Sequence, residues 1–329
     1  MARPKVYVTR LIPEEGLSMV LGACDAEVWE DDAPMPRDVL LDKIRGMDGL
    51  LSLLSDPVDA AIMDAAGAQF RVISNYAVGY DNIDITAANE RGVLVCNTPD
   101  VLTETTADLA FALLMAASRR IVEGAEFVRD DRWRTWGPKL LLGHDIHHAT
   151  LGVIGIGRIG SAVIRRSKGF DMDVICYDTH RQIELEESAN VRVVDNLDDL
   201  LAEADFVTLH VPLTPETHHL IDAAALKKMK RTAILINTAR GTVVDTDALY
   251  EALRDKEIAY AALDVTDPEP LRSNHKLLTL PNCLVVPHIG SASVTTRARM
   301  ATMAAENLLA GLRGDVPPHL VNPEAISNR

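Results

Sequence analysis

The segment Leu151-Gly-Val-Ile-Gly-Ile-Gly-Arg-Ile-Gly160 decides the fold that we expect for this chain. An apolar strand runs into three glycines at GxGxxG spacing, and an apolar helix follows, which is the context that a dinucleotide-binding turn requires. The first glycine permits the tight turn, the second lets backbone approach a pyrophosphate, and the third lets helix and strand pack closely. The N–H groups that open the helix then point at the phosphates. The residues concerned are Gly155, Gly157, Gly160, Arg158 and Ile159.

Asp178 ends the next predicted strand, about twenty residues after the glycines, where an acid is expected to bind the ribose 2′-OH. A carboxylate there repels a 2′-phosphate, so we expect NADH to be preferred and keep NADP as the alternative cofactor. His180 and Arg181 follow closely and could soften that preference. The alternative interpretation is a glycine-rich turn of another α/β protein, with Asp178 an ordinary acid at a strand end.

Short apolar strands alternate with helical segments along most of the chain, which predicts parallel sheets covered by helices on both faces. A length of 329 residues suggests about two domains. The expected strands span residues 5–9, 50–54, 71–75, 93–97, 150–155, 173–178, 191–194, 206–210, 233–237, 260–264 and 283–286. The expected helices of the first hundred residues span 14–22, 37–45, 60–66 and 85–91.

The middle of the chain has a different pattern. Residues 103–128 are rich in Ala and Leu after Thr103 and Glu104, and they predict one long buried helix. The polar, Trp-containing stretch 130–149 predicts a loop, and the tail from Ser291 predicts one more helix, to about Gly311.

The charge balance restricts the partners. A formal net charge of −15 repels phosphate backbones and anionic membranes, so neither nucleic acid nor a membrane is expected as a partner.

No signal-peptide core or membrane-length apolar run is present, which makes the cytoplasm the default location. Four scattered cysteines suggest reduced thiols. His144, His147 and His148 lie in a polar loop without a cluster of acids, so no metal is expected there.

Three polar residues at or after successive strand ends suggest the chemistry. Ligands of open α/β sheets bind at the carboxyl ends of strands, where Arg240, Glu269 and His288 fall. An Arg can bind a carboxylate and polarise a keto oxygen, a His can donate a proton near neutral pH, and an acid beside it stabilises the imidazolium. Alone, each could be a surface charge, a structural His or a loop acid. Their joint placement beside a dinucleotide motif predicts hydride transfer to a small 2-keto acid.

Several motifs resemble the D-isomer-specific 2-hydroxyacid dehydrogenase family over nearly the whole length, and most of all its glyoxylate/hydroxypyruvate reductases. The motifs are Leu53-Leu-Ser-Asp-Pro-Val-Asp59, Asn97-Thr-Pro-Asp-Val-Leu-Thr-Glu-Thr-Thr-Ala107, Gly155-Ile-Gly-Arg-Ile-Gly160, Asn237-Thr-Ala-Arg-Gly241, Leu263-Asp-Val-Thr-Asp-Pro-Glu-Pro-Leu271 and Pro287-His-Ile-Gly-Ser291. Tyr177-Asp-Thr-His-Arg181 is similar to NADH-using glycerate dehydrogenases of the family.

The resemblance implies an NAD(P)-binding Rossmann domain, 102–290, inserted into a substrate-binding domain made of 1–101 and 291–329, with flavodoxin-like or Rossmann-like parallel sheets. It implies a cleft active site in which Arg240 binds substrate, His288 is the acid/base and Glu269 its partner. Substrate would also meet the backbone N–H groups near Val78 and Gly79, and Leu54 and Ser55. The implied cofactor contacts are Thr106, Pro212, Thr217, Thr238 and Asp264. A homodimer through the nucleotide domains, with the helix from Thr103 in the contact, is also implied.

The chain departs from mammalian-type members of the family in one loop. Those members carry two tryptophans there, whereas this chain keeps Trp136 and has Leu140 at the second position. The expected reaction is reduction of hydroxypyruvate to D-glycerate and of glyoxylate to glycolate. The alternatives are a dehydrogenase of lactate, phosphoglycerate or a bulkier keto acid, and a corepressor-like protein that senses NAD(H).

Overall fold

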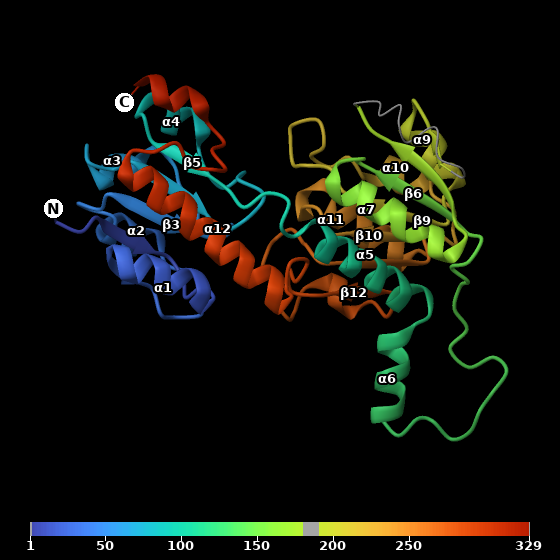
Figure 1. Ribbon diagram of the computed structural model, residues 1–329. Coiled ribbons are helices and arrows are strands. Elements are labelled where there is room, and N and C mark those ends of the chain that lie inside the picture. Colours follow the sequence, from blue (N-terminus) through green and yellow to red (C-terminus); the bar gives the residue numbers. More distant parts are fainter. Residues whose placement is uncertain (1, 180–190, 329) are drawn as a thin grey trace. The chain divides into compact units, whose positions relative to one another are not determined.

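The chain folds into two compact units (Figure 1). The computed structural model describes residues 2–179 and 191–328. The first unit combines Met1–Leu102 with Ser291–Arg329, and the second, Thr103–Gly290, is inserted between these segments.

The first unit is built on a five-stranded parallel sheet. Its strand order, β2-β1-β3-β4-β5, is that of flavodoxin-like folds. The strands are β1 (Lys5–Val8), β2 (Asp25–Val28), β3 (Gly49–Ser52), β4 (Val72–Asn75) and β5 (Leu94–Cys96). The sequence missed β2, an edge strand whose residues are all exposed or only half-buried, so that it lacks an apolar run.

Helices cover both faces of this sheet. Successive side chains of a strand point to opposite faces, so neighbouring residues pack against different helices. Val6 and Val8 pack with α1 (Glu14–Ala23) and α12 (Val294–Arg313). Tyr7 faces the other way and packs with α2 (Arg37–Lys43), α3 (Ala60–Ala66) and α4 (Ile85–Glu90).

The second unit is built on a seven-stranded parallel sheet in the order β12-β11-β10-β9-β6-β7-β8. Its strands are β6 (Thr150–Ile154), β7 (Asp173–Tyr177), β8 (Val191–Val193), β9 (Phe206–Leu209), β10 (Ile234–Asn237), β11 (Tyr260–Leu263) and β12 (Cys283–Val285). Counted within the unit, the first six strands follow the 3-2-1-4-5-6 order of dinucleotide-binding folds. The order reverses between β6 and β9, which is where such folds bind their ligands. The predicted fold class is confirmed.

Helices cover both faces of this sheet as well. One face packs against α5 (Thr103–Ser118) and α7 (Arg158–Ser167). The other face packs against α9 (Leu197–Glu203), α10 (Ala223–Lys228) and α11 (Thr246–Arg254). Short 3₁₀ helices complete the chain: η1 (Lys168–Phe170), η2 (Gly241–Val243), η3 (Lys276–Thr279) and, in the first unit, η4 (Pro323–Asn328).

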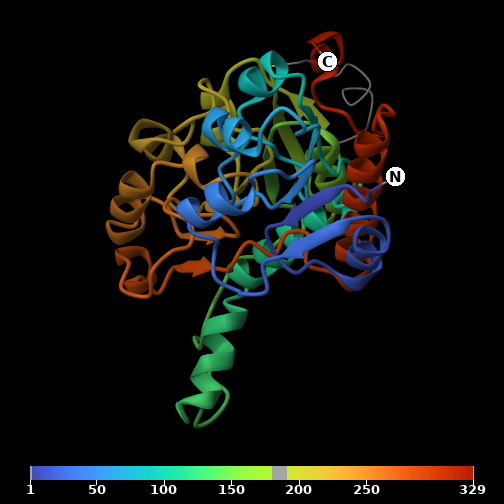
Figure 2. The same cartoon turned by 90° about the vertical axis from the view of Figure 1, so that its left-hand side faces the viewer.

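The prediction of one buried helix over 103–128 is wrong. The structure has α5 and then a separate α6 (Ile121–Arg129), none of whose residues is buried. Arg120 turns the chain between them with a left-handed backbone, φ +51°, and its guanidinium donates to Glu123. The chain returns from the loop at His144, whose N–H donates a hydrogen bond to the carbonyl of Ser118 at 2.8 Å. Figures 1 and 2 both show α6 extending away from the sheet of its own unit.

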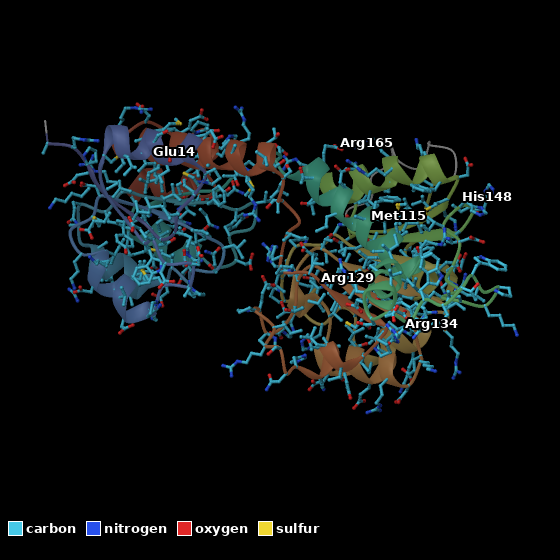
Figure 3. All side chains as sticks on the ribbon, turned by 90° about the horizontal axis from the view of Figure 1, so that it is seen from below. Glu14, Met115, Arg129, Arg134, His148 and Arg165 are labelled. Atoms are coloured by element: carbon cyan, nitrogen blue, oxygen red, sulfur yellow. The ribbon has the colours of Figure 1, made fainter. Side chains whose placement is uncertain are left out.

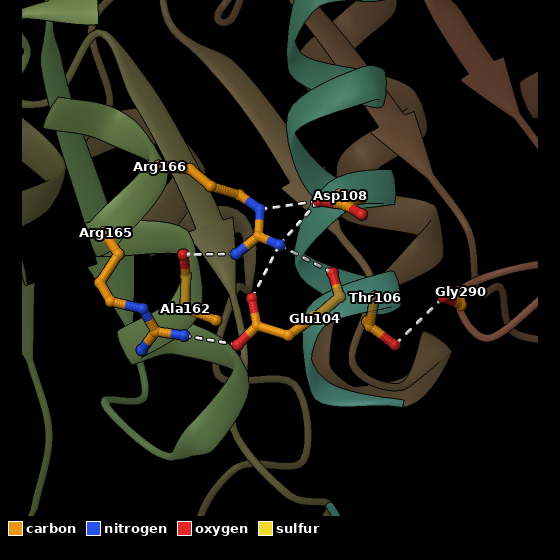
Figure 4. Close-up of polar contacts among 7 residues, drawn as sticks. All are labelled: Glu104, Thr106, Asp108, Ala162, Arg165, Arg166 and Gly290. Atoms are coloured by element: carbon orange, nitrogen blue, oxygen red, sulfur yellow. Dashed lines mark hydrogen bonds and ion pairs between the residues drawn. The ribbon is translucent and has the colours of Figure 1, made fainter. Parts of the chain in front are cut away.

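A network of charges joins α5 to α7 (Figure 4). Arg166 donates to Asp108 at 2.8 Å through Nε and to the backbone oxygen of Glu104 at 3.1 Å. Arg165 donates to the Glu104 carboxylate at 2.5 Å. These bonds fix the first turns of α5 against the helix that follows the glycine turn.

The four cysteines are free thiols. Burial raises the pKa of Cys176 and of Cys283 to about 12, so both thiols stay protonated and unreactive at neutral pH. In the described part of the chain, no helix is both long enough and apolar enough to cross a bilayer.

Candidate active site

Most of the predicted site residues of the second unit follow its parallel strands and therefore share one edge of the sheet. Gly155 follows β6, Asp178 follows β7, Thr238 follows β10, and Asp264 follows β11. His288 comes three residues after β12. Because carboxyl ends of parallel strands meet at the same edge, residues distant in sequence are brought together.

The glycine turn between β6 and α7 has the geometry that its sequence predicts. Gly155 has φ +92°, and a Cβ there would lie 2.8 Å from the backbone of His210 and Val211, after β9. A Cβ on Gly160 would lie 2.0 Å from the carbonyl oxygen of Gly155. Beside Gly157, by contrast, a Cβ would meet no described atom within 4 Å. Two glycines thus permit close packing, and the third leaves backbone open to a ligand.

The residues around this turn fit a dinucleotide. Asp178 accepts the N–H of Ile156 at 2.6 Å, which ties the end of β7 to the glycine turn. The hydroxyl of Thr238 is buried and finds no hydrogen-bond partner among residues 2–179 and 191–328, as expected of a group that serves a polar ligand atom. His180 and Arg181, which were expected to influence the cofactor preference, lie outside the described residues.

His288 and Glu269 form a close polar pair: Nδ1 of His288 lies 2.5 Å from Oε1 of Glu269. The other carboxylate oxygen of Glu269 accepts the N–H of Thr266 at 3.3 Å. Burial raises the pKa of Glu269, but the hydrogen bond and charge of His288, the Thr266 N–H and the charge of Arg240 outweigh it, so the net pKa is lowered. Glu269 is therefore ionised at neutral pH and orients the imidazole through Nδ1.

The backbone of His288 is held in an uncommon conformation, φ +51°. Its N–H donates to the carbonyl of Asp264 at 2.9 Å. The buried carboxylate of Asp264 accepts the next two N–H groups, from Ile289 at 2.6 Å and Gly290 at 2.8 Å. These bonds compensate for the strain of a left-handed non-glycine residue. Burial raises the pKa of Asp264, although the same two N–H groups act to lower it.

Asn237 is a contributor that the sequence interpretation did not single out. Its side chain is buried, donates to the carbonyl of Arg240 at 2.8 Å and accepts the N–H of Ala239 at 3.0 Å. It therefore sets the turn that carries Arg240. The sequence did contain a signal for this role: an Asn that ends an apolar strand, three residues before an Arg.

Two further predicted residues have local partners. Thr106, on α5, donates to the carbonyl of Gly290 at 3.2 Å (Figure 4). Thr217 donates to the carbonyl of Pro212 at 2.7 Å, in the loop after β9. The described residues contain no group of three or more His, Cys, Asp or Glu side chains that could hold a metal ion.

The predicted substrate residues of the first unit share the carboxyl edge of its own sheet. Leu54 and Ser55 follow β3, and Val78 and Gly79 follow β4. Leu54 and Ser55 are exposed, whereas Val78 and Gly79 are half-buried.

Comparison with known proteins agrees with this geometry. Residues 111–290 match the family description "D-isomer specific 2-hydroxyacid dehydrogenase, NAD binding domain". A glyoxylate reductase of Korarchaeum cryptofilum is 51% identical over 328 residues, which cover 99% of this chain and 98% of that protein. A crystal structure of a Thermus thermophilus protein superposes with a TM-score of 0.91 at 48% identity, covering 96% of this chain and 99% of that one.

A second solved structure has a more specific name. It is an NADPH-dependent glyoxylate/hydroxypyruvate reductase of Sinorhizobium meliloti, in complex with NADP and malonate. It has a TM-score of 0.85 and 31% identity, with 98% of both chains covered. Both the expected family and the expected enzyme class are confirmed: the chain belongs to the D-isomer specific 2-hydroxyacid dehydrogenases and is an NAD(P)-dependent oxidoreductase.

Proposed function

We propose that the protein reduces glyoxylate to glycolate and hydroxypyruvate to D-glycerate with NADH. The observation that carries the proposal is the His288–Glu269 pair, 2.5 Å between Nδ1 and Oε1, at the sheet edge where the glycine turn opens. The high identity to glyoxylate reductases supports glyoxylate as a substrate. The cytoplasm is the proposed location.

The roles follow from the chemistry of each side chain. Arg240 binds the substrate carboxylate and polarises the keto oxygen, because its guanidinium donates several hydrogen bonds in one plane. His288 donates a proton to the oxygen as negative charge develops there. Glu269 stabilises the imidazolium before this transfer. His288 must be protonated for reduction and neutral for oxidation, so the two directions have different pH optima.

The cofactor, when bound, supplies the hydride. We assign its pyrophosphate to the turn of Gly155, Gly157 and Gly160 and to the N–H groups of Arg158 and Ile159. The other assigned contacts are Thr106, Asp178, Pro212, Thr217, Thr238 and Asp264. The carboxylate of Asp178 supports a preference for NADH, because it repels a 2′-phosphate. Substrate carboxylate also meets Val78 and Gly79 of the first unit, with Leu54 and Ser55 beside it.

A homodimer is part of the proposal. We define the arm as residues 119–143, which contain α6 and carry Arg129 and Arg134 (Figure 3). A nine-residue helix that buries nothing is not stable by its own hydrogen bonds. Apolar side chains are exposed along the arm: Ile121, Val122, Val128, Trp133, Trp136, Leu140 and Leu142. A second copy covering them explains both features. Analytical ultracentrifugation should show a dimer that Val128→Glu weakens, and a monomeric wild type would overturn this assignment.

The reaction is tested with His288→Asn. The variant should lose most NADH oxidation with glyoxylate and hydroxypyruvate, because Asn cannot donate a proton as an acid does. NADH affinity, followed by fluorescence titration, should be unchanged because the glycine turn is untouched. Full turnover by the variant would overturn the role of His288. Tight NADH binding by a wild type that reduces neither acid would instead favour a sensor of NAD(H).

A further inference from the structure

A group of three asparagines lies at the carboxyl edge of the first unit's sheet, outside the residues assigned so far. Asn75 ends β4, Asn97 follows β5, and Asn82 lies in the loop between β4 and α4. We call these three residues the asparagine bracket. Their side-chain amides donate mainly to the backbone of the loops after β3 and β4, which hold the proposed substrate contacts.

The bracket fixes consecutive carbonyls of the loop after β4. The amide of Asn97 donates to the carbonyl of Val78 at 2.7 Å, and the amide of Asn75 donates to that of Gly79 at 2.9 Å. The backbone N–H of Thr98 donates to the carbonyl of Ala77, the residue before Val78, at 2.8 Å. Three successive peptide groups are therefore held by their oxygen atoms.

In a trans peptide, the C=O of one residue and the N–H of the next point in opposite directions. Holding the Ala77 carbonyl therefore directs the N–H of Val78 the other way, and holding the Val78 carbonyl does the same for Gly79. Neither N–H has a hydrogen-bond partner among the described residues. Successive backbone N–H groups that are free of protein partners can serve as donors to an anion when a turn aims them at the same point.

Asn82 extends the bracket to the other loop. Its amide donates to the carbonyls of Leu53 and Asp56, at 3.0 and 2.9 Å, and its oxygen accepts from Asn75 at 3.1 Å. The buried carboxylate of Asp56 accepts the hydroxyl of Thr9 at 2.5 Å. Both loops are thus braced from one group of buried and half-buried polar side chains.

We propose that the asparagine bracket sets the affinity for the substrate carboxylate by aiming the N–H groups of Val78 and Gly79, with Asn97 and Asn75 as positioning residues. The inference rests on the proposed function, because that function supplies the carboxylate. It predicts an effect on substrate binding without an effect on the cofactor, whose assigned contacts all lie in the second unit.

The test is Asn97→Asp, which places a carboxylate oxygen against the Val78 carbonyl. KM for glyoxylate should rise by about tenfold or more, as expected when hydrogen bonds to an anion are misdirected, while kcat changes by less than about threefold. The affinity for oxamate, measured calorimetrically with NADH bound, should fall in parallel, and NADH affinity should be unchanged. Asn97→Ala, which removes the donor without adding a charge, should change KM and oxamate affinity in the same direction by less.

Asn322→Asp is the matched control. Asn322 is a buried amide of the same unit that donates to Asn89 and to the Val93 carbonyl, at the amino end of β5. It should lower the melting temperature without changing KM or oxamate affinity. Unchanged oxamate affinity in both Asn97 variants, or an equal loss in the Asn322 control, would overturn the inference. A wild type that binds oxamate but does not reduce glyoxylate would refute the proposed function alone; one that does not bind oxamate would refute the inference.

Discussion

Replacing Glu269 by Gln isolates the charge of the His288–Glu269 pair, the proposed catalytic pair, while keeping the shape of the side chain. Nδ1 of His288 and Oε1 of Glu269 are 2.5 Å apart, and the pKa of Glu269 is lowered, so this carboxylate is ionised at neutral pH. A unit charge pair at 4 Å is worth about 4 kcal/mol at an effective dielectric constant of about 20. His288 and Glu269 keep 26% and 35% of their side-chain surface exposed, so water screens the pair. A charge-assisted hydrogen bond of about 1.5 kcal/mol is the appropriate magnitude.

That magnitude corresponds to about one pH unit. In Glu269→Gln, the imidazolium loses its stabilisation, so the pH above which reduction of glyoxylate slows should move down by about one unit. Above that limit kcat/KM should fall by about tenfold, and below it the rate should approach that of wild type. The assay is NADH oxidation by purified protein from pH 5 to 9. Glu251→Gln, at an exposed position of α11, is the control and should leave the profile unchanged. A loss that is equal at every pH would refute the argument from charge.

The pair should also affect stability, and the direction follows from Glu269. Because its pKa is lowered in the folded state, its contribution to the free energy of unfolding is present above the ordinary pKa of a glutamate. The contribution is lost as the pH falls through the lowered value. The difference in free energy of unfolding between wild type and Glu269→Gln, measured by urea titration, should therefore shrink at acid pH. A difference that grows toward acid pH would contradict this linkage.

Three further substitutions test the second unit. Gly160→Ala should weaken NADH binding by about tenfold or more, because its Cβ would lie 2.0 Å from the carbonyl oxygen of Gly155. Gly169→Ala is the control: its Cβ would meet no described atom within 4 Å, so the free energy of unfolding should change by less than about 0.5 kcal/mol. Asp178→Ser should raise the ratio of kcat/KM with NADPH to that with NADH by about tenfold, and an unchanged ratio would remove the argument from the ribose. Arg166→Ala should lower the free energy of unfolding by about 1–2 kcal/mol, because its side chain is only 23% exposed and bonds to Glu104 and Asp108. Arg165→Ala, 58% exposed, should lower it by less, and equal losses would mean that burial is irrelevant at this junction.

Periodicity predicted the second sheet well because of where its strands lie. The central strands β6, β9, β10 and β11 are covered by helices on both faces and are almost wholly apolar, so they appear as short apolar runs between breaker residues. The ends of all seven predicted strands differ from the structure by one residue or so. β2 lies at the edge of its sheet and alternates between exposed and half-buried residues, which is why its pattern was missed. The break between α5 and α6 depends on the return of His144 to the carbonyl of Ser118, a contact that no local window contains.

In the site as well, features set by contiguous residues could be predicted from the sequence, whereas contacts between distant segments could not. The glycine turn is a contiguous motif whose spacing reports its geometry directly. Glu269 and His288 were suggested by residue type at strand ends, but their contact depends on the neighbouring positions of β11 and β12 in the sheet. The asparagine bracket carried no signal at all, since an Asn at a strand end is also an ordinary turn residue.

What distinguishes the bracket is the set of carbonyls that its amides hold, and that set exists only once three strand ends are side by side. Side chains that act on substrate can be suggested from their chemistry, because the reaction requires their type. Side chains that aim backbone groups are under no such requirement. Any donor of suitable length could hold the Val78 carbonyl, so geometry alone assigns the role to Asn97.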